Sequence, residues 1–269
     1  MGQGGAMREN LLLKSWKEGR ATINGWLAIP NSFSAETMAQ QGWDSLTVDM
    51  QHGVVDYQAM VTLLQAVSTT TTVPMVRVPW REPGIIMKTL DAGAYGIICP
   101  MINTKAECEE LVAACHYPPR GNRSFGPIRA LIYSGADYPK HANDTVLAIA
   151  MIETKTALAN LDEITSVPDL DAVYVGPADL ANSMGHEPRF DPEEPKVLEA
   201  IATILKTAKG KGLRAGIHCM SPAFAKRMIG QGFDFTTLMS DARLMAVKAQ
   251  EIVAAMKDRP APGSAGGTY

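Results

Sequence analysis

The amino-acid sequence predicts a single-domain (β/α)8 TIM barrel of the α/β class, and three observations support that prediction. Eight short apolar stretches recur along the 269 residues, amphipathic segments lie between most of them, and no linker interrupts the alternation near the midpoint. A chain of this length can bury one large core. Eight strand-then-helix units fit a closed barrel of parallel strands better than an open sheet.

The predicted strands are short, rich in apolar or β-branched residues, and bounded by Gly, Pro or Asp, as buried parallel strands are. They span residues 22–29, 44–50, 73–79, 95–101, 145–153, 171–177, 214–220 and 234–240.

The segments between the strands repeat the helical spacing of apolar residues. Pro83 suits the first turn of its helix, and Gly42 and Gly93 suit the ends of theirs. The predicted helices span residues 34–42, 56–68, 83–93, 104–115, 155–165, 195–212 and 241–257.

Three regions lie outside this alternation. Residues 116–144 are too long for an ordinary barrel connection, and their Pro, Gly, Arg and aromatic content predicts an ordered excursion over one end of the barrel, as a lid or a subunit contact. Residues 1–20 are expected to form an extension with a first helix, ahead of a barrel over 21–257. Residues 258–269 are expected to form a flexible tail.

Composition argues against several classes of partner. A net charge of −3 and a pI near 6.0 give no electrostatic attraction to nucleic acid or to an anionic membrane. No apolar run approaches the roughly 18 residues of a membrane span, and no signal-peptide pattern opens the chain, so we expect cytoplasmic residence. The four cysteines form no CxxC pair and no zinc-finger spacing, which predicts reduced, non-catalytic thiols at Cys99, Cys108, Cys115 and Cys219.

Polar and charged side chains stand at the ends of four predicted strands. Asp49 and His52 follow the second strand, and Arg77 lies near the end of the third. Glu153 ends the fifth strand, and Asp179 follows the sixth. In a (β/α)8 barrel these ends meet at the face where active sites form. Two carboxylates without a His/Cys set suit a hard ion such as Mg²⁺ or Mn²⁺, and a nearby arginine suits an anionic substrate group.

The charged residues also have simpler interpretations. Strand-end acids such as Glu153 and Asp179 often cap the next helix. Arg77, inside an otherwise apolar strand, can form a structural salt bridge to a core acid. Two acids from neighbouring strands that face one mouth favour the metal site over the helix caps.

The histidines carry less information. His52 has an ordinary pKa near neutrality and can transfer protons at cellular pH, although a lone histidine is more often a hydrogen-bonded turn residue. Asp91 can orient His52 if the fold brings them together. His218 lies inside the seventh strand and is a core or pocket residue.

Six motifs give the sequence a family resemblance. They are GWDSLTVDMQHG, PMVRVPW, KTLDAGAYGIICPMI, YPPRGNRSFG, IETKTALANLDEI and GPADLANSMG, and they run in order between about Trp26 and Leu238. With these motifs the chain resembles the HpcH/HpaI aldolases, a family of metal-dependent pyruvate aldolases that includes 4-hydroxy-2-oxoheptanedioate aldolases. The resemblance implies a barrel of the phosphoenolpyruvate/pyruvate superfamily.

The resemblance also implies a role for each matching residue. Glu153 and Asp179 would hold a divalent metal ion, Mg²⁺ or Mn²⁺, with Co²⁺ as a further option. Arg77 would bind the keto-acid carboxylate or keto oxygen and stabilise the enolate. His52, oriented by Asp91, would be the catalytic acid and base.

Further positions are expected to bind substrate. The backbone at Gly176, Pro177 and Ala178 would line the pyruvate site, and Arg123 with its loop would close over the mouth or reach the variable end of the substrate. Gln51 stands where many relatives carry an acid, and Met151 where a glutamine is common, so both positions are expected to affect substrate preference. The whole predicted substrate-binding set is Arg77, Gly176, Pro177, Ala178, Trp26, Gln51, Met151 and Arg123.

The expected activity is that of a class II aldolase. It would form or cleave 4-hydroxy-2-oxo acids, with pyruvate or hydroxypyruvate as the enolate component and an aldehyde as acceptor. The resemblance further implies a homo-oligomer, either a trimer or a hexamer built from trimers, with a helix exchanged between subunits. Three alternatives remain at this point: oxaloacetate decarboxylase, a citrate-lyase-like acyl-CoA lyase, and a non-catalytic keto-acid-binding barrel. The sequence determines neither the aldehyde nor the stereochemistry nor the preferred metal.

Overall fold

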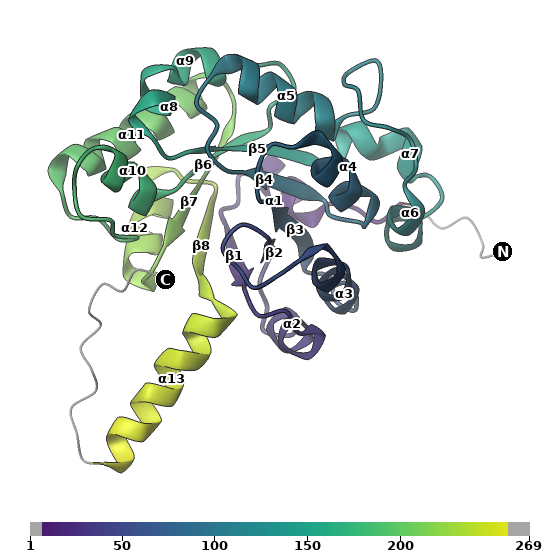
Figure 1. Cartoon of the computed structure of the whole chain (residues 1–269). Coiled ribbons are helices and arrows are strands. Elements are labelled where there is room, and N and C mark those ends of the chain that lie inside the picture. The colour runs from purple at the N-terminus through teal and green to yellow at the C-terminus, as the bar shows by residue number, and fades with distance from the viewer. Residues whose placement is uncertain (1–6, 258–269) are drawn as a thin grey trace.

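Eight parallel strands close into a barrel in chain order, with β8 paired to β1 (Figure 1). This computed structural model describes residues 7–257, so the predicted tail 258–269 and the first six residues of the predicted extension lie outside it. The single-domain (β/α)8 barrel is confirmed. The strands are β1 (Thr22–Leu27), β2 (Ser45–Asp49), β3 (Val73–Arg77), β4 (Gly96–Cys99), β5 (Leu147–Ile152), β6 (Ala172–Val175), β7 (Arg214–Cys219) and β8 (Phe235–Ser240).

One helix, α1, precedes the first strand; helices then follow every strand and, except for the last helix, run back along the outside of the barrel. They are α1 (Leu11–Lys17), α2 (Ser32–Ala39), α3 (Tyr57–Val67), α4 (Pro83–Asp91), α5 (Lys105–Cys115), α6 (Ile128–Ser134), α7 (Tyr138–His141), η1 (Ala142–Asp144), α8 (Lys155–Ala159), α9 (Leu161–Ile164), α10 (Pro177–Ser183), α11 (Pro195–Gly210), α12 (Pro222–Gln231) and α13 (Asp241–Met256).

Local chemistry corrects some helix boundaries. The helix predicted over 34–42 begins earlier, because Asn31 caps it by accepting hydrogen bonds from the backbone amides of Phe33 and Ser34. It also ends at Ala39, ahead of Gly42. The helix predicted over 155–165 is divided at Asn160 into α8 and α9. Helices α10 and α12 complete the barrel at positions where the apolar spacing does not predict them.

The first helix contributes to the amino-terminal end of the barrel. Trp16 of α1 is buried, and its ring centroid lies 5.1 Å from that of Phe235 on β8. The Trp16 indole also donates a hydrogen bond to the Thr22 hydroxyl at 3.0 Å. Gly216 on β7 makes room for this packing, because a Cβ there would lie 2.2 Å from the Phe235 ring.

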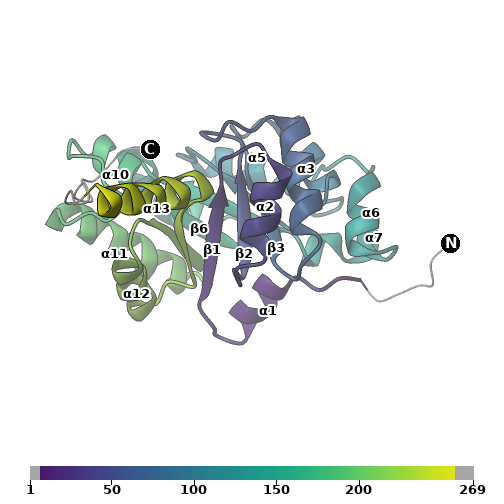
Figure 2. The ribbon, with the colours of Figure 1, turned by 90° about the horizontal axis from the view of Figure 1, so that it is seen from below.

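The long segment 116–144 is ordered, as predicted, and contains α6, α7 and η1. It joins the end of α5 to the start of β5, and therefore lies toward the amino-terminal rim of the strands. Figures 1 and 2 show α6 and α7 on the side of the molecule away from α10. The prediction of a lid over this chain's own barrel mouth is wrong for that reason, while a subunit contact stays a prediction.

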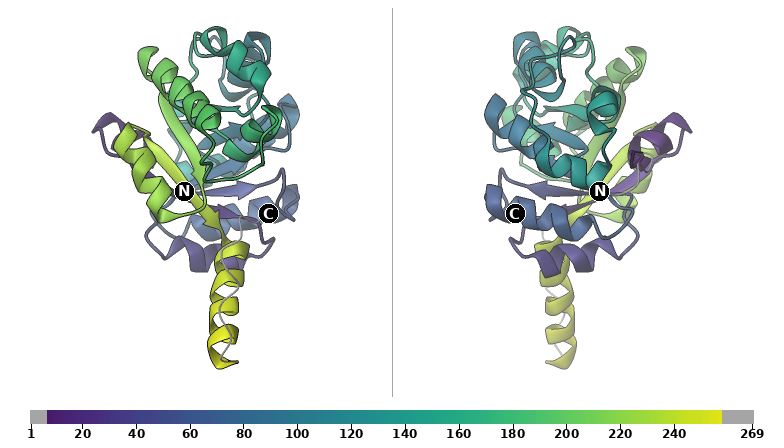
Figure 3. Two further views of the ribbon diagram at one scale, coloured as in Figure 1. Left: turned by 90° about the vertical axis from the view of Figure 1, so that its left-hand side faces the viewer. Right: turned by 90° about the vertical axis from the view of Figure 1, so that its right-hand side faces the viewer.

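The last helix, α13, projects away from the barrel instead of lying along it (Figures 1 and 3). Its first turn is anchored by Asp241, which accepts hydrogen bonds from the Ala28 amide at 2.8 Å and the Ser34 hydroxyl at 3.0 Å. Farther along, α13 exposes apolar side chains. Within residues 7–257, no helix combines the length and apolar character of a membrane span.

Candidate active site

A cavity of about 240 Å³ opens at the carboxyl ends of the barrel strands. It brings together Asp49, His52, Arg77, Glu153 and Asp179, the five residues that the strand-end rule selects. Four residues of the predicted substrate-binding set besides Arg77 also line it, namely Trp26, Met151, Gly176 and Ala178.

Asp49 and Arg77 form a buried ion pair in one wall of the cavity. Arg77 donates two parallel hydrogen bonds, from Nε to Oδ1 at 2.9 Å and from Nη2 to Oδ2 at 2.7 Å. The Trp26 indole donates a third hydrogen bond to the Asp49 carboxylate at 3.0 Å, and the guanidinium lies 4.9 Å from the Trp26 ring centroid. The core salt bridge considered from the sequence therefore exists, and its arginine also lines the cavity.

The charge of Asp49 is maintained by this arrangement. Burial favours the neutral acid, but the charge and hydrogen bonds of Arg77, with the hydrogen bond from Trp26, hold the pKa of Asp49 below its ordinary value. An ionised Asp49 in turn keeps the guanidinium in one orientation.

The turn after β2 winds around the same carboxylate. Asp49 Oδ1 accepts hydrogen bonds from the backbone amides of Gln51 at 3.0 Å and His52 at 3.2 Å. Gly53 completes the turn, where a Cβ would lie 2.3 Å from the Asp49 carbonyl oxygen. One side chain thus orients Arg77 and shapes the loop that carries His52 to the cavity.

The imidazole of His52 is held toward its neutral form. Burial and the positive charge of Arg77 lower the pKa of His52, and the negative charges of Asp49 and Asp179 oppose that effect. A neutral imidazole at pH 7 can accept a proton, as a general base requires.

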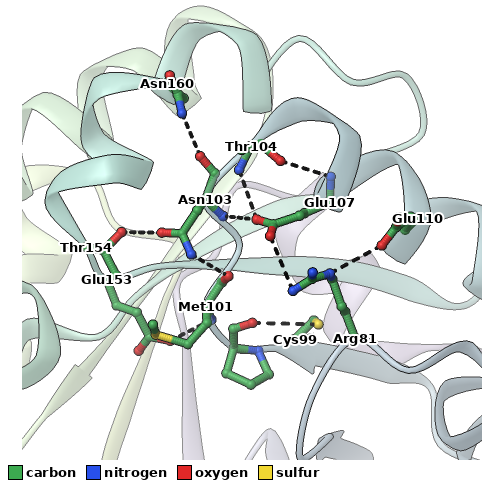
Figure 4. A network of polar contacts seen from close by, with 11 residues as sticks. Arg81, Cys99, Met101, Asn103, Thr104, Glu107, Glu110, Glu153, Thr154 and Asn160 are labelled. Carbon is green, nitrogen blue, oxygen red and sulfur yellow. Dashed lines mark hydrogen bonds and ion pairs between the residues drawn. The ribbon is translucent and has the colours of Figure 1, made fainter.

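Glu153 follows β5 and is buried. Its Oε1 accepts a hydrogen bond from the backbone amide of Met101 at 2.8 Å, and Met101 adopts the left-handed backbone conformation with φ of 56° (Figure 4). Burial, with a smaller contribution from the charge of Asp179, raises the pKa of Glu153 to about 7. A nearby cation would favour the ionised form.

A polar network holds the loop that presents the Met101 amide (Figure 4). Asn103 is its centre: its side-chain amide donates to the Met101 carbonyl at 2.9 Å, and its carbonyl accepts from Asn160 Nδ2 at 2.8 Å. Its backbone amide donates to Glu107 at 2.7 Å, and its side-chain oxygen accepts from the Thr154 hydroxyl. Sequence reasoning missed this support, although the capping box that opens α5 with T-x-x-E was a usable signal.

Glu153 and Asp179 fit a hard divalent cation. Asp179 lies in the first turn of α10, and its negative charge acts on Glu153 across the cavity. Gly176 leaves space for the glutamate, because a Cβ there would lie 2.5 Å from Glu153 Oε2. Among residues 7–257 no cluster of three or more His, Cys, Asp or Glu side chains has metal-site geometry. Two carboxylates would supply only part of a coordination shell, which suits an ion that keeps water or substrate oxygens.

Some predicted site residues lie elsewhere. Asp91 ends α4, which runs back from the cavity rim, and its carboxylate accepts a hydrogen bond from Arg123 Nη2 at 2.6 Å. Arg123 is buried in the 116–144 segment and also donates to the Tyr138 hydroxyl at 3.0 Å. The fold does not bring either residue to the cavity of its own chain. Within one chain, Asp91 therefore does not lie beside His52, and Arg123 does not close the cavity.

Two other predicted substrate-binding residues, Pro177 and Gln51, do not line the cavity. Pro177 is buried as the first residue of α10. Gln51 contributes its backbone to the turn after β2, and its buried side-chain oxygen has no hydrogen-bond partner among residues 7–257.

Part of the cavity lining was missed from the sequence. His218, considered there as a core or pocket residue, proves to be a pocket residue. The lining residues that the sequence did not indicate are Ala28, Tyr174, Phe190, Met220, Met239, Ser240, Ala242 and Arg243.

Comparison with known proteins identifies the family. The family model described as HpcH/HpaI aldolase/citrate lyase matches residues 23–247. The chain belongs to the HpcH/HpaI family. A hydroxypyruvate/pyruvate aldolase from Rhizorhabdus wittichii is 44% identical, over 91% of this chain and 98% of its own length. A 2-dehydro-3,6-dideoxy-6-sulfogluconate aldolase from Pseudomonas putida is 33% identical, over 94% of this chain and 99% of its own.

Solved structures agree with this assignment. An HpcH/HpaI aldolase/citrate lyase family protein from Burkholderia cenocepacia has a TM-score of 0.86 at 29% identity, covering 92% of this chain and 99% of that one. This HpcH/HpaI protein is an aldolase, a carbon–carbon lyase, as the sequence predicts.

Proposed function

We propose that this HpcH/HpaI protein is a divalent-metal-dependent aldolase that forms and cleaves 4-hydroxy-2-oxo acids, with pyruvate or hydroxypyruvate as the enolate component. The observation that carries the proposal is the convergence of Arg77, His52 and the Glu153–Asp179 pair on one cavity. The similarity to an aldolase named for hydroxypyruvate and pyruvate supports the same keto acids here.

Glu153 and Asp179 would hold the metal ion. A bound Mg²⁺ or Mn²⁺ supplies Lewis-acid polarisation of the substrate ketone. Glu153 is suited to this position because its neighbours fix it: the Met101 amide holds one oxygen, and the missing side chain at Gly176 leaves room for the other. The ionised carboxylate, which burial disfavours, gains a counter-charge when the ion binds.

Arg77 would bind the oxygens of the keto acid and stabilise the negative charge that develops in the enolate. Its orientation is set in advance by two hydrogen bonds to Asp49, so little reorganisation is needed when the charge appears. Arg77 and Trp26 are only 6% and 3% exposed, and this burial strengthens the interaction of the guanidinium with a bound charge.

His52 would transfer the proton. In the cleavage direction the neutral imidazole takes the proton of the substrate 4-hydroxyl, the bond between C3 and C4 breaks, and the aldehyde leaves. The electron pair of that bond remains on the keto acid as its enolate, which is then protonated at C3. Addition runs through the same steps in reverse. The lowered pKa of His52 keeps the acceptor form available at neutral pH.

Pyruvate release from racemic 4-hydroxy-2-oxo acids, measured with and without EDTA, tests this function. We expect release that EDTA abolishes and that added Mg²⁺ or Mn²⁺ restores. If no such acid yields pyruvate under any metal condition, the proposal is wrong. Oxaloacetate assayed in parallel separates an aldolase from a decarboxylase, because only the aldolase also yields an aldehyde from a hydroxy acid.

We also propose that the chain acts as a homo-oligomer, either a trimer or a hexamer. The apolar side chains that α13 exposes support a contact with a neighbouring subunit: Met245, Ile252, Val253 and Met256 are 61%, 55%, 50% and 81% exposed. A helix that projects with such a surface gains most by packing on a second copy.

A further inference from the structure

The cavity also contains a histidine that the proposed chemistry does not use. His218 lies on β7, and its exposed surface faces the cavity. Its ring packs edge-on against Trp26, with centroids 5.2 Å apart, and at a tilt of 41° against Phe190, with centroids 4.9 Å apart. Among residues 7–257 its only recorded hydrogen bond is made through Nδ1.

A chain of hydrogen bonds behind His218 favours one of the two tautomers of its ring. The Tyr174 hydroxyl donates to Thr237 Oγ1 at 2.7 Å, and the same Thr237 oxygen accepts from Asn24 Nδ2 at 3.0 Å. Asn24 is held in that orientation because its side-chain oxygen accepts from the hydroxyls of Ser45 at 2.8 Å and Thr47 at 3.1 Å.

With the Tyr174 proton in the hydrogen bond to Thr237, the Tyr174 oxygen is available to accept. His218 Nδ1 lies 3.1 Å from that oxygen, an ordinary length for an N–H donor. The tautomer that satisfies the chain carries its proton on Nδ1 and leaves a lone pair on Nε2. Burial and the charge of Arg77 lower the pKa of His218 to about 3, so the ring is neutral at pH 7.

A neutral ring with a lone pair on Nε2 accepts hydrogen bonds and repels carboxylate and keto oxygens. It fits a substrate O–H group, which can donate to Nε2. A methyl group at the same place would leave Nε2 without a hydrogen-bond partner. The position of His218 shows which part of the substrate that group belongs to. The Trp26 ring contacts both His218 and the Arg77 guanidinium, so His218 lies close to the group that would bind the keto acid.

We infer that His218 is a specificity-determining residue that accepts a hydrogen bond from a hydroxyl on C3 of the 2-oxo acid, and so favours 3-hydroxy-2-oxo acids over pyruvate as the enolate component. This inference rests on the proposed aldolase function. Tyr174 is a positioning residue in this scheme, because it acts through the tautomer of His218. A site that offers an acceptor to a hydroxyl discriminates strongly against the analogue that lacks it.

The test compares kcat/KM for hydroxypyruvate and for pyruvate with propanal, an aldehyde without a hydroxyl, as common acceptor. We expect the wild type to favour hydroxypyruvate, and His218→Phe to lower the hydroxypyruvate-to-pyruvate ratio about tenfold or more, the effect of one lost hydrogen bond to a buried group. His186→Phe, outside the cavity, is the matched control and should leave the ratio unchanged. Circular dichroism establishes that both variants fold.

The possible outcomes distinguish a failure of this inference from a failure of the proposed aldolase function. If both donors react and the ratio is the same in wild type and His218→Phe, the inference is overturned while the aldolase function stands. If neither donor reacts with the wild type, the function itself fails and the inference falls with it.

A second measurement observes the tautomer directly. Long-range ¹H–¹⁵N spectra of histidine-labelled protein, with the His218 signals assigned by their loss in His218→Phe, should show the proton on Nδ1 at pH 7. We expect Tyr174→Phe to shift this population toward the Nε2–H form and to lower the hydroxypyruvate ratio while kcat for pyruvate changes less. A wild-type spectrum with the proton on Nε2 would overturn the assignment.

Discussion

Arg77 and Asp49 occupy paired positions on β3 and β2, and their side chains meet through two parallel hydrogen bonds of 2.9 and 2.7 Å. Both side chains are buried, and Trp26 holds the Asp49 carboxylate from another direction at 3.0 Å. Because the same carboxylate also binds the amide of His52, one acid fixes two of the groups on which the proposed chemistry depends.

Replacing Arg77 by lysine tests whether the orientation of its charge matters. We expect Arg77→Lys to lower kcat for pyruvate release by about 100-fold, because an ammonium keeps the charge but loses the planar pair of donors. Steady-state kinetics and a thermal melt measure the two effects separately. Arg20→Lys is the matched control, since Arg20 pairs with Glu18 at the surface through the same two nitrogens, at 3.1 and 3.0 Å. Full activity in Arg77→Lys would rule out an oriented guanidinium as a catalytic requirement.

Gly176→Ala tests the proposed metal site without removing a ligand. The added methyl would lie 2.5 Å from Glu153 Oε2, so the carboxylate must move. We expect the affinity for Mn²⁺, measured by calorimetry, to fall about 10- to 100-fold, as when the support of a metal ligand is lost. Gly230→Ala on α12 is the control, since a Cβ there has no atom within 4 Å. Unchanged Mn²⁺ affinity in Gly176→Ala would argue that Glu153 does not bind the metal.

Much of the barrel could be predicted because its strands are buried on both faces. Such strands form continuous apolar runs, and the charged residues that end them stand out, as Glu153 does after β5. The barrel then brings the strand ends to one rim without any knowledge of side-chain contacts, which is why His52, Arg77 and Asp179 were found.

The rest depended on relationships that the sequence does not contain. Asp91 and Arg123 are 32 residues apart, and their pairing requires knowing toward which rim the 116–144 segment folds. Tyr174 and His218 lie in apolar strands where inward and outward residues look alike, so only the register of β6 and β7 shows that both face the cavity. The left-handed conformation of Met101 directs its amide at Glu153. The sequence does not indicate this conformation, because the residue is not a glycine.

The stability of the barrel should depend on pH through Asp171. This acid precedes β6 at the amino-terminal rim and accepts a hydrogen bond from the Ala148 amide at 2.8 Å. Burial raises its pKa from 3.8 to about 7, so the folded chain binds this proton more tightly than the unfolded chain does. The resulting stabilisation is complete below about pH 4 and is lost as the pH rises through about 7.

Asp171→Asn stays neutral at every pH and can still accept the Ala148 hydrogen bond. We expect its stability relative to the wild type to increase by about 1–2 kcal/mol between pH 5 and pH 8.5, because only the wild type loses stability over that interval. Urea unfolding at both pH values measures the difference. Asp162→Asn, at a side chain 79% exposed, controls for the loss of one negative charge. A wild type that gains stability relative to Asp171→Asn between pH 5 and 8.5 would contradict the prediction.

The projecting helix α13 should determine the assembly state. Ile252 and Val253 lie next to each other in its last two turns and are 55% and 50% exposed, a surface that α13 does not bury within its own chain. We expect Ile252→Asp to shift sedimentation toward smaller species, because the new charge would lose its hydration in an apolar contact. Lys248→Ala, four residues earlier on the same helix and 72% exposed in its ion pair with Glu251, is the control and should sediment as the wild type. A wild type that sediments as a monomer, or an Ile252→Asp variant that keeps the wild-type assembly, would exclude this surface from the subunit contact.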